Sequence, residues 1–114
     1  MTKLTAKRCK ACEGGVSPLS VEESKKLLKD IPKWNLDLTD VHTLHRTFEF
    51  KNYFRTMAFV NAIAWIAHEE NHHPDLEVVY DRCVVRYSTH AINGLSENDF
   101  ICAAKVDALL PEHE

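Results

Sequence analysis

The spacing of apolar residues changes several times along the chain, and each change marks a new element. The first regular stretch begins at Ser20, which forms with Glu23 the S-x-x-E pattern of a capping box. Apolar residues then recur at helical spacing until Pro32, which is incompatible with a helix interior. The stretch 20–31 is therefore predicted to be a helix.

Two later stretches show the alternation of apolar and polar residues that is typical of half-buried strands. In 34–50 the alternation runs on both sides of a turn at Asp40, and Arg46 is an exception to it. In 76–88 it runs on both sides of a turn at 81–82. We therefore predict two β-hairpins.

Helical spacing returns after each predicted hairpin. The stretch 53–71 follows Asn52, a suitable N-cap, and is apolar on most sides. Such a helix is buried on more than one side, here by the sheet and by a partner subunit. The last helix is predicted over 96–110, with Asp99 in its first turn.

The predicted order is α-β-β-α-β-β-α, which indicates an α+β fold with three helices on one face of a four-stranded, largely antiparallel sheet. The chain has 114 residues, enough for one domain, which we place at 18–112. Residues 1–17 show no periodicity and are predicted to form an N-terminal arm. This arm contains Cys9 and Cys12 in a C-x-x-C pattern. Three interpretations of this pair are open, namely half of a zinc site, a redox pair, or an incidental pair without a function.

Composition narrows the class of protein. Hydrophobic residues make up 45% and charged residues 27% of the chain, as in ordinary globular proteins. The formal net charge of −3 gives no indication of nucleic-acid binding. Since the N-terminus has no apolar segment behind its basic residues and Asn61 interrupts the best candidate span, we expect a cytoplasmic protein without a membrane segment.

The chemistry is concentrated in residues 68–74, where three histidines and two carboxylates precede Pro74. Proline disfavours helical geometry for His73, so the helix is expected to end at about His72. The two adjacent histidines would then stand on a corner and point in different directions. Histidine titrates near neutral pH, which suits either proton transfer or metal binding. A third interpretation is that these histidines form a polar helix end without a function.

The same stretch also contains the H-E-x-x-H pattern of zinc hydrolases at His68, Glu69 and His72. This metal reading requires both histidines on an uninterrupted helix and a third protein ligand. The acid–base interpretation adds a third candidate residue, His90, which lies where the second hairpin ends. Because the hairpin folds back on itself, His90 is expected to return close to His72 and His73.

Four motifs together resemble the pterin-4a-carbinolamine dehydratases. They are N-H-H-P at 71–74, S-T-H at 88–90, G-L-S at 94–96 and Asp99. The resemblance covers most of 20–110, and the order of predicted elements agrees with the family's fold. The cysteine-bearing arm is similar to that of bacterial members, a lineage associated with phenylalanine hydroxylase.

The resemblance implies a lyase that removes water from 4a-hydroxytetrahydrobiopterin, or a similar pterin, to give the quinonoid dihydropterin. No metal or organic cofactor is implied. The implied catalytic residues are His72, His73, His90 and Asp99. The implied pterin pocket consists of Asn71, His72, His73, Pro74, Ser88, Thr89, His90 and Ala91.

The resemblance also leaves a different class of function open. Some relatives serve as dimerisation cofactors of a transcription factor, and the apolar helix 53–71 would suit such an interaction module or a homodimer or homotetramer. The sequence departs from the family at His68, where many members have glutamate, and at Leu76, where an aromatic residue is common. A leucine cannot stack on a pterin ring as an aromatic residue can.

Overall fold

The computed structural model describes residues 3–10 and 17–110. The predicted α+β fold and its α-β-β-α-β-β-α order are confirmed, with element ends within about three residues of those expected. The α-helices are α1 (Val21–Leu28), α2 (Tyr53–Glu70) and α3 (Glu97–Asp107), and two short 3-10 helices are η1 (Leu4–Ala6) and η2 (His90–Ile92). The strands are β1 (Asn35–Asp37), β2 (Thr43–Glu49), β3 (Asp75–Val79) and β4 (Arg82–Tyr87).

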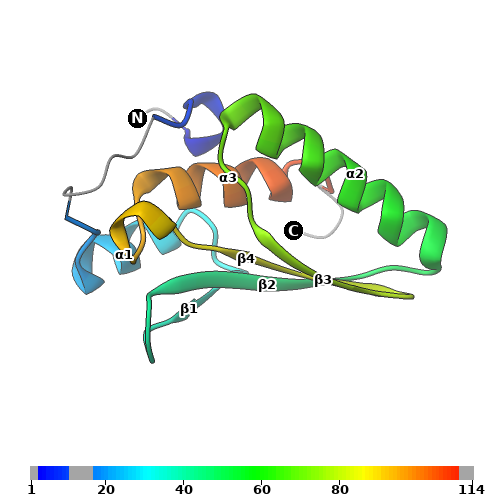
Figure 1. Ribbon diagram of the computed structural model, residues 1–114, viewed down its shortest axis with the longest axis horizontal. Coiled ribbons are helices and arrows are strands. Elements are labelled where there is room, and N and C mark those ends of the chain that lie inside the picture. Colours follow the sequence, from blue (N-terminus) through cyan, green and yellow to red (C-terminus); the bar gives the residue numbers. More distant parts are fainter. Residues whose placement is uncertain (1–2, 11–16, 111–114) are drawn as a thin grey trace.

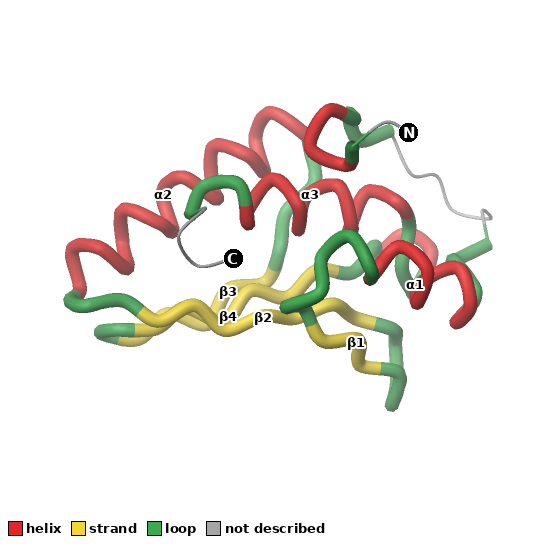
Figure 2. Tube along the Cα trace, turned by 180° about the vertical axis from the view of Figure 1, so that it is seen from behind, coloured by secondary structure: helices red, strands yellow, loops and turns green. Residues whose placement is uncertain are grey.

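The four strands form one sheet in the order β1-β2-β4-β3, and every neighbouring pair is antiparallel. Both predicted hairpins are present, β1 with β2 and β3 with β4. Pairing of β2 with β4 joins them, with Leu44 opposite Tyr87 and Phe48 opposite Cys83. Figures 1 and 2 show the α-helices on one side of this sheet, and no helix of the described residues 3–10 and 17–110 covers its other side.

The core lies between the sheet and α3. Nearly every residue of α3 is buried, including Phe100, Ile101 and Cys102, and this helix also contacts η1 and α2. The strands contribute alternate residues to the same core, as their sequence pattern predicts. These strand residues are Leu44, Phe48, Cys83, Val85 and Tyr87.

Arg46, the exception in the alternation, lies on the buried face of β2 and is only 7% exposed. Its Nη1 forms an ion pair with Oδ1 of Asp107 at 2.7 Å. Its guanidinium carbon also lies 4.3 Å from the centre of the Phe48 ring. Nε1 of Trp34 also donates a hydrogen bond to the same Asp107 oxygen, at 2.9 Å. The charge is thus accommodated by a buried carboxylate and an aromatic face.

Part of the predicted N-terminal arm packs against the domain. Leu4 of η1 is buried in the hydrophobic core, and η1 contacts α3. In Figure 1 this segment, drawn in blue, lies beside the C-terminal end of α2. Cys12, the second cysteine of the C-x-x-C pattern, lies outside the described residues.

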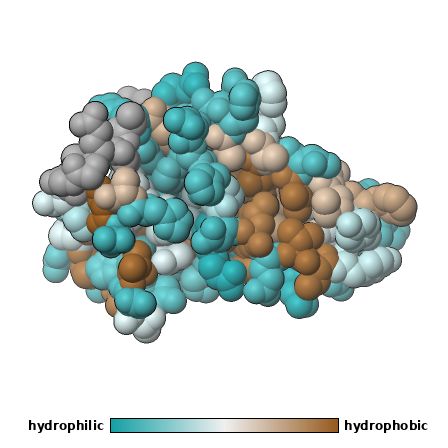
Figure 3. Space-filling view, viewed as in Figure 1, coloured by the Kyte–Doolittle hydropathy of each residue, from teal (hydrophilic) through white to brown (hydrophobic). Residues whose placement is uncertain are grey.

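Helix α2 packs only one side on the chain's own core. Its buried residues include Phe59 and Ile63, whereas Phe54 is 82% and Trp65 is 64% exposed. Strand β3 is an edge strand, and Val78 is also exposed. Figure 3 shows apolar side chains gathered on the face where α2 lies above β3. Within 3–10 and 17–110, no helix has both the length and the apolar character needed to cross a membrane.

Candidate active site

The histidine pair is positioned by the way α2 ends. Asn71 adopts the left-handed conformation, with φ 51° and ψ 43°. Its N–H donates to the His68 carbonyl, and the His72 N–H donates to the Ala67 carbonyl at 3.2 Å. These two bonds form a Schellman motif, which asparagine tolerates at this position better than most residues. The helix therefore ends at Glu70, slightly before the predicted His72, and the chain turns away from it.

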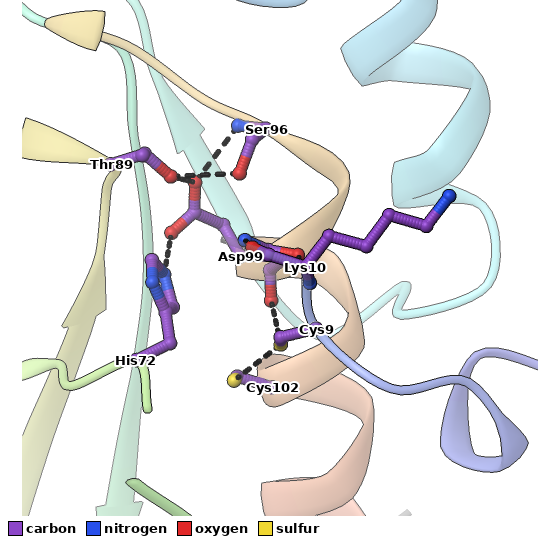
Figure 4. A network of polar contacts seen from close by, with 8 residues as sticks. Cys9, Lys10, His72, Thr89, Ser96, Asp99 and Cys102 are labelled. Atoms are coloured by element: carbon purple, nitrogen blue, oxygen red, sulfur yellow. Dashed lines mark hydrogen bonds and ion pairs between the residues drawn. The ribbon is translucent and has the colours of Figure 1, made fainter. Parts of the chain in front are cut away.

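His72 contacts a buried carboxylate from a distant element. Its Nε2 lies 2.7 Å from Oδ1 of Asp99, which is 0% exposed in the first turn of α3. The other oxygen, Oδ2, accepts from the Thr89 hydroxyl at 2.7 Å and from the Ser96 N–H at 3.0 Å. Figure 4 shows this network, in which Asp99 lies between His72 and the pair of hydroxyl-bearing residues. Both carboxylate oxygens of Asp99 are thereby held in place.

Tyr87 at the end of β4 supports the His72 ring from one side. The two rings are nearly parallel, with 8° between their planes and 5.9 Å between their centres. Tyr87 is completely buried, and this burial is the main reason that the pKa of its hydroxyl is raised well above the usual range. The phenol therefore stays neutral, and its ring lies parallel to the His72 imidazole.

His73 and His90 face one another across the site. Their ring centres are 6.2 Å apart, with 27° between the planes, and both residues are exposed. His90 begins η2, directly after Thr89, whose backbone pairs with Gly94. The return of the hairpin therefore brings His90 to the histidine pair, as the sequence predicts.

A pocket of about 350 Å³ opens at this point, a size typical of small-molecule sites. Seven of the residues expected from the sequence line it, and these are Asn71, His72, His73, Ser88, Thr89, His90 and Ala91. Asp99 is not among the lining residues, because it lies behind His72. Pro74 is not among them either, and it leads from the histidine pair into β3.

Four further lining residues were not expected from the sequence, namely Cys9, Lys10, Glu70 and Asn98. Two of them hold the N-terminal segment in place. The Cys9 N–H donates to Glu70 Oε1 at 2.8 Å. Asn98 exchanges two bonds with Lys10, accepting from its N–H at 3.0 Å and donating to its carbonyl at 2.6 Å. The N-terminal segment is thus one wall of the pocket.

Glu70 is a buried anion with several partners. Its Oε2 lies 3.0 Å from Lys105 Nζ and 3.0 Å from Arg8 Nε. Burial alone would raise the pKa of this carboxyl, but the Cys9 N–H, Lys105 and Arg8 together outweigh it and lower the pKa to about 2. Glu70 therefore remains ionised and links α2, α3 and the N-terminal segment.

The structure separates the two histidines of the H-E-x-x-H pattern. His68 is on α2 and packs beside Trp65, with ring centres 5.5 Å apart, whereas His72 follows the end of the helix. His68 is not among the residues that line the pocket. Across the described ranges 3–10 and 17–110, no three or more histidine, cysteine or acidic side chains are grouped so that they could hold a metal ion.

The structure is a small α+β domain with a pocket that is lined by His72, His73 and His90. A family model described as pterin 4 alpha carbinolamine dehydratase matches residues 17–109 of the chain. The chain belongs to this family, as its motifs indicate.

Close relatives match nearly the whole chain. A protein of Nitrosomonas europaea, provisionally named a pterin-4-alpha-carbinolamine dehydratase, is 64% identical over 107 residues, covering 93% of this chain and 92% of its own. A Legionella pneumophila protein with the same provisional name is 56% identical over 108 residues, covering 94% and 95%. These matches span 107 and 108 residues, so the similarity extends beyond residues 17–109, which the family model matches.

Two solved structures share the fold. A transcriptional coactivator/pterin dehydratase from Brucella melitensis matches with a TM-score of 0.77 and 28% identity, covering 82% of this chain and 98% of its own. A pterin dehydratase-like protein described as a RuBisCO assembly factor in the alpha-carboxysome matches with a TM-score of 0.59 and 26% identity, covering 68% and 88%. The same fold thus occurs in proteins whose described roles differ.

Proposed function

We propose that the protein is a hydro-lyase that removes water from a 4a-hydroxytetrahydropterin such as 4a-hydroxytetrahydrobiopterin, giving the quinonoid dihydropterin. The contact between His72 and Asp99 is the observation that carries the proposal, because it couples an imidazole in the pocket to a buried carboxylate. His73 and His90 line the same pocket. Membership of the family supplies the class of substrate.

The reaction needs two proton transfers. A general acid protonates the departing 4a-hydroxyl, while a general base removes the proton on N5 so that a C=N bond forms. Each well-placed transfer typically accelerates a reaction by about 10²–10⁴-fold. We assign these roles to His72 and His90, and we assign binding and orientation of the pterin to His73. No electrons are transferred in the elimination, so it requires no redox cofactor.

Asp99 is a positioning residue in this mechanism, since it touches His72 and not the pocket. We assign the ring proton of His72 to Nε2, so that Nε2 donates a hydrogen bond to Oδ1 of Asp99. This assignment leaves Nδ1 as the ring nitrogen that takes up a proton. Thr89 and Ser96 both donate to Oδ2 and prevent the carboxylate from rotating away.

The test is an assay in which a pterin-dependent hydroxylase generates the 4a-hydroxytetrahydropterin in place. The wild type should accelerate its dehydration, and His72→Ala should reduce turnover by about 10²–10⁴-fold. His68→Ala is the matched control, because His68 belongs to the same histidine stretch but does not line the pocket. Equal losses in both variants, or no acceleration by the folded wild type, would refute the proposal.

The physiological setting is a separate part of the proposal. We propose that the protein recycles the pterin of an aromatic amino acid hydroxylase, such as phenylalanine hydroxylase, in the cytoplasm. Deletion of the gene should then slow growth that depends on this hydroxylase, and a chain carrying His72→Ala should not restore it. Restoration by that variant would contradict the recycling role.

We also propose that the protein assembles as a homodimer or homotetramer. Exposed apolar residues on α2, including Phe54 and Trp65, would be covered by a second copy. Sedimentation should show an oligomer for the wild type and a smaller species for Trp65→Glu. A monomeric wild type at micromolar concentration would refute this assembly.

An interaction role is the second candidate function. It is favoured by the exposed apolar face of α2 and by the described roles of the Brucella and alpha-carboxysome proteins, which include coactivation and assembly. An interaction module does not depend on the pocket histidines. Partner binding retained by His72→Ala, in a protein whose wild type shows no dehydratase activity, would favour this role.

A further inference from the structure

Two thiols from distant parts of the chain meet beside the pocket. Sγ of Cys9 lies 3.5 Å from Sγ of Cys102, although the residues are 93 positions apart. Cys9 follows η1 in the N-terminal segment, and Cys102 is on α3, three residues after Asp99. Figure 4 shows the two sulfur atoms directed at each other, below the network around Asp99.

The backbone on both sides of Cys9 is held in place. Glu70 accepts the N–H of Cys9 itself, and Asn98 forms two hydrogen bonds with the next residue, Lys10. A disulfide has an S–S distance of about 2.05 Å, so the sulfur atoms need to approach by only about 1.5 Å. Rotation of the two side chains and a small backbone adjustment supply such a movement. The two sulfur atoms are therefore about 1.5 Å from bonding distance before any oxidation.

The two thiols differ in access. Cys9 is partly exposed and is among the residues that line the pocket, so we expect it to be the more accessible of the two thiols. Cys102 is completely buried. The hydrogen bond with Cys9, together with burial, raises the pKa of the Cys102 thiol. An oxidant is thus expected to meet Cys9 first, and Cys102 is placed to attack Cys9 afterwards.

We propose that Cys9 and Cys102 are a redox-active dithiol site that reacts with small disulfides and closes to an intramolecular disulfide. In the first step the Cys9 thiolate attacks a disulfide RSSR, forming a Cys9–S–S–R bond and releasing RS⁻. In the second step the Cys102 sulfur attacks Cys9, its proton passes to the leaving RS⁻, and RSH departs. The two protein thiols are oxidised, and RSSR is reduced to two thiols.

The bond would tie the N-terminal wall of the pocket to α3. Its effect on dehydration rests on the proposed function, whereas formation of the bond itself does not. A test that maps the bond chemically therefore separates failure of this inference from failure of the proposed activity.

The experiment uses the full chain, reduced with dithiothreitol, freed of reductant and incubated with oxidised glutathione. Remaining thiols are alkylated, and the protein is digested with trypsin and analysed by mass spectrometry. Trypsin places Cys9, Cys12 and Cys102 on separate peptides, which are residues 9–10, 11–25 and 87–105. Most of the protein should show peptide 9–10 linked to 87–105, and dithiothreitol should reverse this link.

Cys12→Ser is the matched control, because it removes the other cysteine of the C-x-x-C pattern. This variant should still form the link between Cys9 and Cys102, and Cys9→Ser should lose it while its circular dichroism spectrum stays that of the wild type. A link of Cys9 to Cys12 in place of Cys102 would overturn the proposal. Two further outcomes would also overturn it. One is a stable mixed disulfide between Cys9 and glutathione, and the other is complete alkylation of both Cys9 and Cys102.

Discussion

His72 and Asp99 are joined at 2.7 Å although 27 positions separate them in the chain. The geometry depends on two helix ends, since His72 follows the end of α2 and Asp99 lies in the first turn of α3. Both ends carry local signals, namely the left-handed Asn71 and the bond from the Ser96 N–H to Asp99. The pair is therefore positioned by the backbone as well as by its own hydrogen bond.

Replacement of Asp99 by asparagine should separate positioning from binding. The amide in Asp99→Asn keeps the size of the side chain but loses the negative charge and one of the two acceptor oxygens. If His72 has the proposed role, kcat for dehydration should fall at least about 10-fold, because the ring loses the carboxylate that orients it. KM should change little, because Asp99 does not line the pocket.

Asp75→Asn serves as the control for this variant, because Asp75 is an exposed aspartate at the start of β3. Its kcat should equal that of the wild type. Steady-state kinetics of the three proteins, with circular dichroism as the check on folding, gives the comparison. A fall in kcat/KM of Asp99→Asn that comes from KM alone would contradict the positioning role.

Glu70 should make the stability of the protein sensitive to acid. Its pKa is about 2 in the folded protein and 4.5 in an unperturbed chain, so the unfolded state takes up this proton first. The stabilisation is fully present above about pH 4.5 and is lost as the pH falls towards 2. The depressed pKa corresponds to a contribution of up to about 3 kcal/mol to the free energy of unfolding.

Glu70→Gln removes this titration. Urea unfolding at several pH values should show a large difference in stability between wild type and variant above pH 5, and a small one near pH 2. The interpretation would be wrong if the difference were the same at all pH values. The variant should also loosen the N-terminal segment, because Cys9 and Arg8 lose the charged acceptor.

The elements of the fold could be predicted because their signals are local. Ser20 and Glu23 form both bonds of the expected capping box, and the alternation in β2 and β4 matches their buried residues. The proximity of His90 to the histidine pair was predictable for a related reason, since the hairpin between β3 and β4 brings its two ends together. Short-range patterns and one antiparallel pairing were sufficient for both.

The contacts that remained unpredicted connect residues far apart in the sequence. Nothing near Arg46 indicates that Asp107 neutralises it, and nothing near Glu70 indicates that Cys9 and Lys105 bind it. Such pairs depend on how whole elements pack, which no periodicity expresses. The end of α2 does have a local sequence signal. Asparagine adopts the left-handed conformation more readily than most residues, so Asn71 indicates where the helix can end.

That conformation leads to a prediction for two variants of Asn71. Glycine adopts positive φ without strain, so Asn71→Gly should retain the stability of the wild type within about 0.5 kcal/mol. A β-branched residue is strained there, and Asn71→Val should lose about 1–2 kcal/mol. Urea unfolding of both variants provides the measurement. Equal stability of the two variants would show that the left-handed conformation is not required.

The last prediction concerns the buried ion pair of Arg46 and Asp107. Asp107→Ala removes the carboxylate oxygen that accepts from both Arg46 and Trp34, and it leaves the guanidinium charge inside the protein. Breaking a buried pair in this way typically costs about 3–5 kcal/mol. We expect a loss of this size in the free energy of unfolding, measured with urea.

A double variant tests whether the cost comes from the remaining charge. Arg46→Met with Asp107→Leu removes both charges and fills much of the space with apolar atoms, which is often nearly neutral for a buried pair. It should therefore be more stable than Asp107→Ala, although Trp34 loses an acceptor in both proteins. If the double variant were as unstable as the single one, the cost would lie in packing and in the Trp34 bond. If it recovers most of the loss, the buried charge of Arg46 is what makes Asp107 necessary.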